Sequence, residues 1–154
     1  MSGGPLSVRV ARKSIEAEDI CSLELVSADG APLPAFAAGS HVDVQLPGGP
    51  TRQYSLCNDP AETHRYLIAV LRDPATRGGS LAMHDKVQVG DLLQISAPKN
   101  HFALAHEAKS HLLLAGGIGG LIIFLLWDIQ PIRSTLKKMP AWNFVGRKMK
   151  KNLA

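Results

Sequence analysis

The sequence predicts a mainly β protein: a six-stranded antiparallel Greek-key barrel with one capping helix, followed by a fragment of an α/β domain. Two observations lead to this prediction. Short runs rich in Val, Ile and Leu alternate with turn signals through the first hundred residues, a spacing typical of antiparallel barrels and sandwiches. The continuous apolar run Leu112–Ala115 then enters the glycine turn Gly116–Gly119, as expected for a strand buried on both faces of a parallel sheet.

Each expected strand is bounded by residues that break regular structure. Pro47-Gly48-Gly49-Pro50 and Asn58-Asp59-Pro60 are two such boundaries. Between residues 41 and 46 polar and apolar residues alternate strictly, as in a strand with one solvated face. The six expected strands are Leu6–Lys13, Ile20–Val26, His41–Leu46, Arg52–Cys57, Arg65–Leu71 and Leu92–Ala97.

One helix is expected between the fifth and sixth strands. Ser80 is a suitable N-cap for a helix over Leu81–Lys86, because its hydroxyl can accept a hydrogen bond from a free N–H of the first turn. Gly90 follows closely enough to mark the exit from the helix. The helix would therefore close one side of the barrel.

Composition and charge limit the class of protein. A chain of 154 residues that is 45% hydrophobic and 19% charged can bury a core and is not disordered. Residues 1–127 carry 10 Lys/Arg and 12 Asp/Glu, a net charge of −2, whereas residues 128–154 carry 7 Lys/Arg and one Asp, a net charge of +6. The basic character therefore belongs to the tail, where a solvated segment is favoured over a nucleic-acid contact.

The two cysteines, Cys21 and Cys57, are not part of a Cys-x-x-Cys pair. This argues against a disulfide scaffold and against a zinc or iron–sulfur site built from this chain alone. The first residues lack the cationic patch and apolar run of a signal peptide. We therefore expect a cytoplasmic protein with reduced thiols and no bound metal.

The candidate ligand site consists of two short clusters. Arg52-Gln53-Tyr54-Ser55-Leu56 supplies a cation, an aromatic ring and a hydroxyl, and Gly78-Gly79-Ser80 follows 22 residues later. A guanidinium offers a planar set of donors to a phosphate, and glycines let backbone N–H groups come close to it. Together the clusters suit a ligand with one phosphate and one flat polar ring, such as flavin mononucleotide (FMN).

The order of these motifs resembles the flavin-binding barrel of ferredoxin-reductase-type proteins. Gly39-Ser40-His41-Val42 leads to the Arg52–Pro60 segment, and Gly78-Gly79-Ser80, Val89-Gly90-Asp91 and Pro98–Phe102 follow in the family's order. The Leu-Cys-Asn ending of the second motif is most similar to the phthalate dioxygenase reductase and vanillate demethylase reductase branch. The resemblance covers residues 6–119.

The resemblance implies a barrel that holds FMN, with FAD as the alternative, and a second domain that binds NADH. It also implies a ferredoxin domain with a [2Fe–2S] cluster, which we do not expect in this sequence because it has only two cysteines, and a Rieske-type oxygenase as the partner that receives the electrons. An NADH-dependent oxidoreductase is therefore the expected enzyme class, with the flavin, NAD(P)H and an oxygenase component as partners. No nucleic-acid partner is expected.

The resemblance also assigns roles to individual residues. Arg52 and the Gly78–Ser80 turn would hold the phosphate, Tyr54 would lie along the isoalloxazine or ribityl chain, and Ser55 would point toward the reactive ring edge. The backbone of Ala69–Leu71 would meet the pyrimidine side of the ring. The expected flavin-binding set is Arg52, Gln53, Tyr54, Ser55, Leu56, Ala69, Val70, Leu71, Gly78, Gly79 and Ser80. The expected remnant of the nucleotide site is Gly116, Gly117, Ile118 and Gly119.

The sequence departs from the family pattern after Gly119. The expected domains are the barrel, residues 1–106, and the first strand and glycine turn of an NAD-binding domain, residues 107–119. An atypical apolar and then basic tail occupies residues 120–154. The change of composition suggests a truncated or frameshifted reading frame.

Two alternatives stay open: a flavin-binding module without its own dehydrogenase activity, and a membrane- or polyanion-associated fragment that acts through residues 112–151. A true membrane span at Leu112–Trp127 is disfavoured, since that segment has only 16 uncharged residues.

Overall fold

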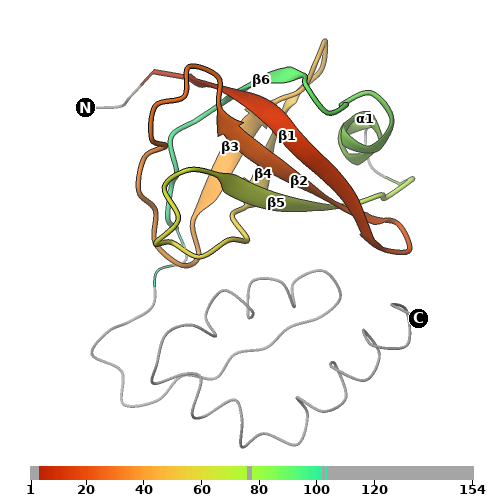
Figure 1. Cartoon of the computed structure of the whole chain (residues 1–154). Coiled ribbons are helices and arrows are strands. Elements are labelled where there is room, and N and C mark those ends of the chain that lie inside the picture. The colour runs from red at the N-terminus through yellow and green to blue at the C-terminus, as the bar shows by residue number, and fades with distance from the viewer. Residues whose placement is uncertain (1–3, 76–77, 102, 104–154) are drawn as a thin grey trace, which may run out of the picture.

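The structure, a computed structural model, describes residues 4–75, 78–101 and 103 of the chain. Strands and helix follow the order that the sequence predicts (Figure 1). The expected glycine turn Gly116–Gly119, the apolar segment 112–127 and the basic tail lie outside the described residues. The elements are β1 (Leu6–Ala17), β2 (Ile20–Ser27), β3 (His41–Gln45), β4 (Thr51–Ser55), β5 (Tyr66–Leu71), α1 (Gly79–Asp85) and β6 (Leu92–Ile95).

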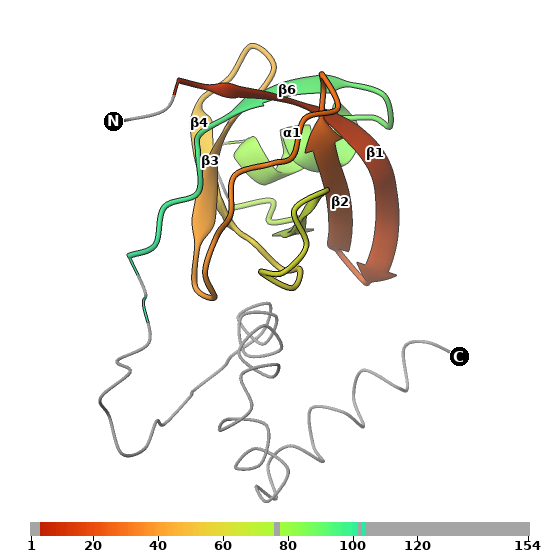
Figure 2. The ribbon, with the colours of Figure 1, turned by 60° about the vertical axis from the view of Figure 1, so that its left-hand side comes forward.

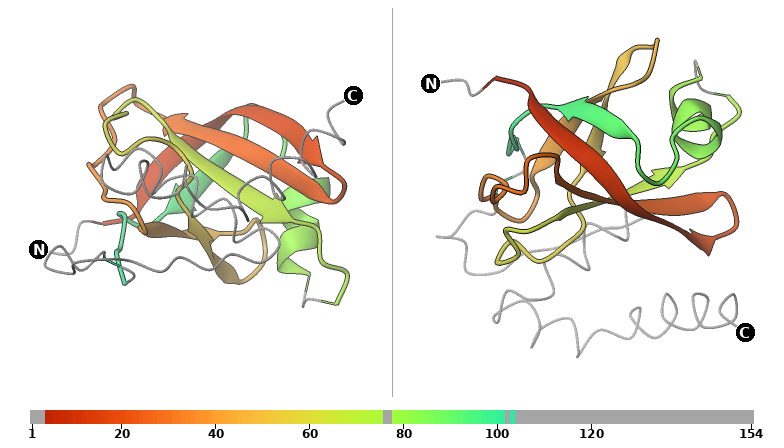
Figure 3. Two further views of the ribbon diagram at one scale, coloured as in Figure 1. Left: turned by 90° about the horizontal axis from the view of Figure 1, so that it is seen from below. Right: turned by 45° about the horizontal axis from the view of Figure 1, so that its top comes forward.

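The six strands form one antiparallel sheet in the order β4-β3-β6-β1-β2-β5. The sheet curls into a half-barrel, seen from below and from above in Figure 3. Strand β6, which follows α1 in the chain, lies between β3 and β1 (Figure 2), and this gives the Greek-key order. One isolated antiparallel bridge, between Leu56 and Ile68, joins the chain after β4 to β5. The two end strands of the sheet therefore meet at this point.

The core fills the inside of the curl. Alternate residues of the strands point inward, and the pattern is clear in β3, where Val42 and Val44 are fully buried. Helix α1 adds Met83, and Val87 follows it. The largest fully buried side chains are Tyr66, Leu23, Leu25, Leu46, Leu56, Ile68, Met83, Leu93 and Ile95.

Strand β1 is longer than the sequence predicts. It continues past Lys13 to Ala17 and pairs with β2 through a tight turn in which Asp19 adopts a positive φ of 57°. The register shifts between Val10 and Arg12 and again before Ala17, so the alternation of apolar residues is lost. Ile15 is 77% exposed. The apolar residues of this extension, Ile15 and Ala17, do not continue the alternation of Val8 and Val10 in phase, and they are not buried in the core, so the sequence pattern did not mark the extension as part of the strand.

The start of helix α1 differs from the prediction. The N-cap is Gly78, with φ 83°, and Ser80 lies within the first turn instead of capping it. The Ser80 hydroxyl accepts a hydrogen bond from the Asp73 amide and donates one to the Asp73 carbonyl, both at 3.2 Å. A residue with a side chain is strained at a positive φ, so the glycine is needed at this N-cap. The prediction of Ser80 as N-cap was therefore wrong.

Candidate functional site

Arg52 and Tyr54 lie on the inner face of β4. In the pairing with β3, Tyr54 stands opposite Val42 and Arg52 stands opposite Val44, and cross-strand partners point to the same side of a sheet. Since both valines are buried in the core, the two site residues also face inward. Both are only half-buried, because β4 is an end strand with no further strand beside it in the sheet order.

Gln53 lies on the opposite face of β4. Its side chain is exposed and it pairs with Asp43 on the outer face of the barrel. A side chain cannot reach both faces of its own strand, so any contact between Gln53 and a ligand at Arg52 would have to come from its backbone. This follows from the alternation of a strand and distinguishes Gln53 from its neighbours in the motif.

Arg52 lies directly against the glycine turn before α1. A methyl group at Gly79 would come within 2.9 Å of Arg52 Nε and 3.1 Å of its Cγ, closer than nonbonded atoms normally approach. The Arg52 side chain therefore occupies the space that a side chain at Gly79 would need. Its Nη1 donates to the Thr51 carbonyl at 3.0 Å, and no carboxylate lies within ion-pair distance of it among the described residues. The structure thus brings together the two sequence clusters.

The remaining residues of the first cluster extend from this point into the core. Burial raises the pKa of Tyr54, and the nearby charge of Arg52 partly opposes this, so the phenol stays neutral. Ser55 pairs with His41 and is half-buried. Leu56 is buried, and its amide donates to the Ser40 carbonyl at 2.9 Å. Leu56 therefore fixes the end of β4 and has no side-chain access to a ligand.

Ala69, Val70 and Leu71 lie across from this cluster on β5, the other end strand. Alternation along β5 turns the N–H and C=O groups of Leu67, Ala69 and Leu71 away from β2. The Leu67 groups are used, because its carbonyl accepts from Cys57 at 2.6 Å and its amide donates to Asn58 at 2.9 Å. Beyond the Leu56–Ile68 bridge the described residues show no further pairing between β4 and β5.

The end strands therefore separate on the side that carries Arg52 and Tyr54. The edge of β5 there presents Ala69 and Leu71, and Leu71 is 41% exposed. The side chain of Val70 is buried, and its carbonyl contacts His84 Nε2 of α1 at 2.9 Å. A flat group that hydrogen-bonds along its rim could occupy such an unpaired strand edge, with Tyr54 on the facing strand.

Helix α1 closes the third side of the site. It has only seven residues, so the dipole at its N-terminus is weak and Arg52 supplies the main positive charge. The Ser80 hydroxyl is held by Asp73, as described above. Its predicted contact with a phosphate stays a prediction, and in this structure the hydroxyl stabilises the loop that leads into α1.

Cys57 lies at the same end of the site. Burial raises the pKa of its thiol to about 11, partly opposed by a hydrogen bond from the Ala69 backbone. Its Sγ lies 3.4 Å from the Ser55 carbonyl. Such a thiol stays protonated at neutral pH and is a poor nucleophile. Cys57 is therefore better interpreted as a small packing residue than as a reactive thiol.

Asn58 has a role that the sequence reasoning did not assign. It is 4% exposed, its Oδ1 accepts from the Leu67 amide at 2.9 Å, and its Nδ2 donates to the Arg65 carbonyl at 3.0 Å. The Asn58 side chain thus takes the place of a neighbouring strand at the start of β5, because it satisfies backbone groups of Arg65 and Leu67. The signal available in the sequence was an asparagine directly after a predicted strand, because asparagine commonly satisfies backbone groups of turns.

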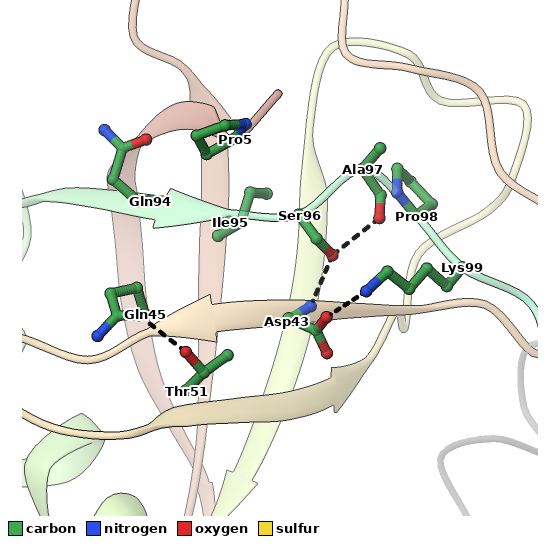
Figure 4. A pocket seen from close by; sticks show the side chains of 10 residues that line it. All are labelled: Pro5, Asp43, Gln45, Thr51, Gln94, Ile95, Ser96, Ala97, Pro98 and Lys99. Carbon is green, nitrogen blue, oxygen red and sulfur yellow. Dashed lines mark hydrogen bonds and ion pairs between the residues drawn. The ribbon is translucent and has the colours of Figure 1, made fainter. Parts of the chain in front are cut away.

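A pocket of about 750 Å³ lies elsewhere, on the outer face of the barrel. Figure 4 shows the Lys99–Asp43 ion pair, with N and O 2.5 Å apart, and the Thr51–Gln45 hydrogen bond at its wall. Asp43 and Gln45 point outward on β3, opposite to Val42 and Val44. The pocket is therefore separated from Arg52 and Tyr54 by the sheet itself. Its lining residues are Pro5, Asp43, Gln45, Thr51, Gln94, Ile95, Ser96, Ala97, Pro98 and Lys99.

The fold, together with the site enclosed by β4, β5 and α1, points to a class of protein. The described domain has the fold of the FAD-binding domain of ferredoxin reductases, and a phthalate dioxygenase reductase structure matches it with a TM-score of 0.76 and 46% identity. That match covers 80% of this chain and 38% of the reductase. No family model matches the chain.

Within this class the chain is a homologue of the vanillate O-demethylase oxidoreductases and phthalate dioxygenase reductase. It is 57% identical over 110 residues to a vanillate O-demethylase oxidoreductase of Pseudomonas putida, covering 71% of this chain and 35% of the relative. The relatives are named oxidoreductases or reductase subunits of oxygenase systems. The resemblance seen in the sequence is thereby confirmed. The chain spans about one third of the length of the curated relatives it matches.

One further relative bears on the region after Gly119. The reductase subunit of a phthalate 4,5-dioxygenase of Pseudomonas putida is 41% identical over 141 residues, which cover 92% of this chain and 41% of the relative. A match of that length must extend past Gly119. This match therefore does not support the expectation that the sequence similarity to the family stops at Gly119. Within the described part of the chain, no helix is both long and apolar enough to cross a membrane, and the segment 112–127 lies outside that part.

Proposed function

We propose that this domain binds FMN and serves as the flavin-binding part of an NADH-dependent reductase that supplies electrons to an oxygenase. The observation that carries the proposal is the close approach of Arg52 of β4 to the backbone of Gly79, the first residue of α1. It places a fixed cation and a side-chain-free turn next to each other, although 27 residues separate them in sequence. This is the arrangement that a phosphate needs.

The rest of the site fits a flavin that extends from this phosphate. Tyr54 lies one inward position further along β4 from Arg52, toward the place where β4 and β5 meet. The ring would lie between Tyr54 and the edge of β5. There the backbone of Leu71 and the Ala69 carbonyl can hydrogen-bond its polar rim, whereas the Ala69 amide is already used by the Cys57 thiol. Ser55 would lie near the reactive edge of the ring. When bound, the flavin supplies the redox chemistry, and the protein binds and orients it.

FMN is favoured over FAD because the described site has one cation for one phosphate. Arg52 is the cation that contacts the glycine turn, whereas the neighbouring Arg72 is paired with Asp85 at 2.6 Å. A second phosphate would need another donor set next to the first. FAD is the alternative, since one solved relative is described as the FAD/NAD binding domain of a nitric oxide dioxygenase.

The electron partners are part of the same proposal. The related phthalate dioxygenase reductase structure is described as transferring electrons from pyridine nucleotides to a [2Fe–2S] centre. We therefore assign NADH as donor and an iron–sulfur centre, followed by a Rieske-type oxygenase, as the acceptors in the whole reductase. A cytoplasmic location goes with this assignment.

The test is to purify the full chain, denature it and identify the released cofactor by chromatography. The expected result is FMN in a ratio of about one per chain. Release of FAD would contradict the single-phosphate argument while keeping the flavin site. A protein that contains no flavin and does not bind added FMN would contradict the proposed function as a whole.

A further inference from the structure

Lys13 of β1 makes an unusual set of contacts with the end of helix α1. Its Nζ donates to the backbone carbonyls of Met83 at 3.1 Å, His84 at 2.6 Å and Val87 at 2.8 Å. These acceptors lie about 70 residues away in sequence. An ammonium group has three donors, so all of them are used on this one turn of backbone.

These contacts satisfy groups that the helix leaves open. Helix α1 ends at Asp85, and the carbonyls of its last turn have no partner within the helix. Lys13 supplies both hydrogen bonds and a positive charge at this end, where a cation is favourable. Among the described residues no carboxylate forms an ion pair with Lys13. Its charge is therefore directed at the helix end.

Two further contacts tie the same end of α1 to β5 and to Arg72, the residue that follows this strand. His84 Nε2 lies 2.9 Å from the Val70 carbonyl, and Asp85 pairs with Arg72 at 2.6 Å. The opposite end of the helix lies against Arg52 of β4 through Gly79. Seven residues make a helix of about 10 Å, so a short rigid unit joins the Lys13 contacts at one end to the glycine turn at the other.

We propose that Lys13 is a positioning residue of the phosphate site. It holds the end of α1, and thereby fixes the distance between the Gly78–Gly79 turn and Arg52. This inference rests on the proposed flavin site. It predicts that removal of the Lys13 donors weakens binding of the phosphate and leaves recognition of the ring nearly unchanged, because the side-chain hydrogen bonds of Lys13 go to the end of α1 and none of them goes to Tyr54 or β5.

The experiment compares FMN with riboflavin, which has the same ring and ribityl chain but no phosphate. Dissociation constants of the full chain, freed of bound flavin, are measured by quenching of flavin fluorescence. In Lys13→Met, which keeps the length of the stem and loses the donors, the dissociation constant for FMN should rise by about 5- to 20-fold. The constant for riboflavin should change by less than about twofold. Lys13→Arg should restore part of the FMN affinity, since a guanidinium can also donate to carbonyls.

Lys99→Met is the matched control, because Lys99 pairs with Asp43 on the outer face of the barrel. It should leave both constants unchanged. If Lys13→Met does not fold, Lys13→Gln, which keeps a shorter amide donor, takes its place in the same comparison. Equal loss of FMN and riboflavin binding, or no loss of either, would overturn the positioning role. A wild-type protein that binds riboflavin as tightly as FMN would instead contradict the phosphate site of the proposed function.

Discussion

The side chain of Arg52 lies so close to the backbone of Gly79 that a side chain at Gly79 would clash with it. A Cβ at Gly79 would lie 2.9 Å from Arg52 Nε and 3.4 Å from its Cδ. Gly79 has no positive φ, so the need for glycine here comes from this contact and not from the backbone conformation. Glycine is therefore needed at this position because the Arg52 side chain of the site takes up the space of a side chain.

Gly79→Ala should weaken FMN binding by about 1–2 kcal/mol, because the methyl group displaces Arg52 from the turn. Stability should fall less than affinity, since the Arg52 side chain is only half-buried and can move outward. Titration with FMN and thermal unfolding of the apoprotein measure the two effects separately. Gly49→Ala is the matched control, because a Cβ there would meet only an ordinary contact at 3.4 Å. Unchanged FMN affinity in Gly79→Ala would show that the turn does not approach the ligand.

Arg52→Ala should weaken FMN binding by about 1.5–3 kcal/mol, the range for hydrogen bonds to charged groups. Arg52→Lys should recover only part of this, since an ammonium loses the planar set of donors. Binding constants from fluorescence quenching provide the measurement. Arg9→Ala, at an exposed position of β1, should have no effect. If both Arg52 variants keep wild-type affinity, the phosphate is bound elsewhere.

The Cys57 thiol should react slowly with iodoacetamide at neutral pH. With a pKa of about 11, only about one thiol in a thousand is ionised at pH 8, compared with about a quarter for a free cysteine. The rate should therefore keep rising as the pH is raised beyond 9, for as long as the protein stays folded. Mass spectrometry of the Cys57 peptide, with denatured protein as reference, gives the rate. A fast reaction at pH 7 would show an activated thiol beside the site.

Glu62→Gln should reduce stability at neutral pH and have a smaller effect in acid. The hydrogen bond from Arg65, 2.8 Å long, holds the pKa of Glu62 below its ordinary value of 4.5. A carboxylate with a lowered pKa stabilises the fold above its unfolded-state pKa, and this contribution is lost as the pH falls through the folded-state value. Urea unfolding at pH 7 and at decreasing pH below 4.5 tests the prediction. A difference between wild type and variant that does not shrink in acid would contradict it.

The sequence predicted the strands around the site well, because they carry clear patterns. Strands β3, β4 and β5 fall within two residues of their expected bounds, since each has alternation or an apolar run between turn residues. The separate clusters at Arg52 and Gly79 could be proposed as one site from ligand chemistry. Their contact could not be seen, because it depends on how the barrel curls.

Other parts of the site lay beyond sequence reasoning. The outward position of Gln53 follows from its register with Asp43, which the motif alone does not show. The helix begins one residue earlier than expected, so that Gly78, with its positive φ, is the N-cap, and the Ser80 hydroxyl bonds to Asp73 instead. In the sequence, nothing distinguishes Lys13 from another lysine on a strand. Its contacts with the end of α1 depend on how β1 and α1 pack together. These features depend on tertiary contacts between residues far apart in sequence.

The separation of β4 from β5 beyond Leu56 has a consequence for handling the protein. An unpaired strand edge is a template to which a strand from another molecule can add, and Leu71 there is 41% exposed. A ligand that covers this edge would keep the protein soluble as well as serve as its cofactor, and would stabilise the fold by an amount that grows with the logarithm of the ligand concentration. Protein produced with too little riboflavin in the growth medium should therefore precipitate more readily than protein produced with ample riboflavin.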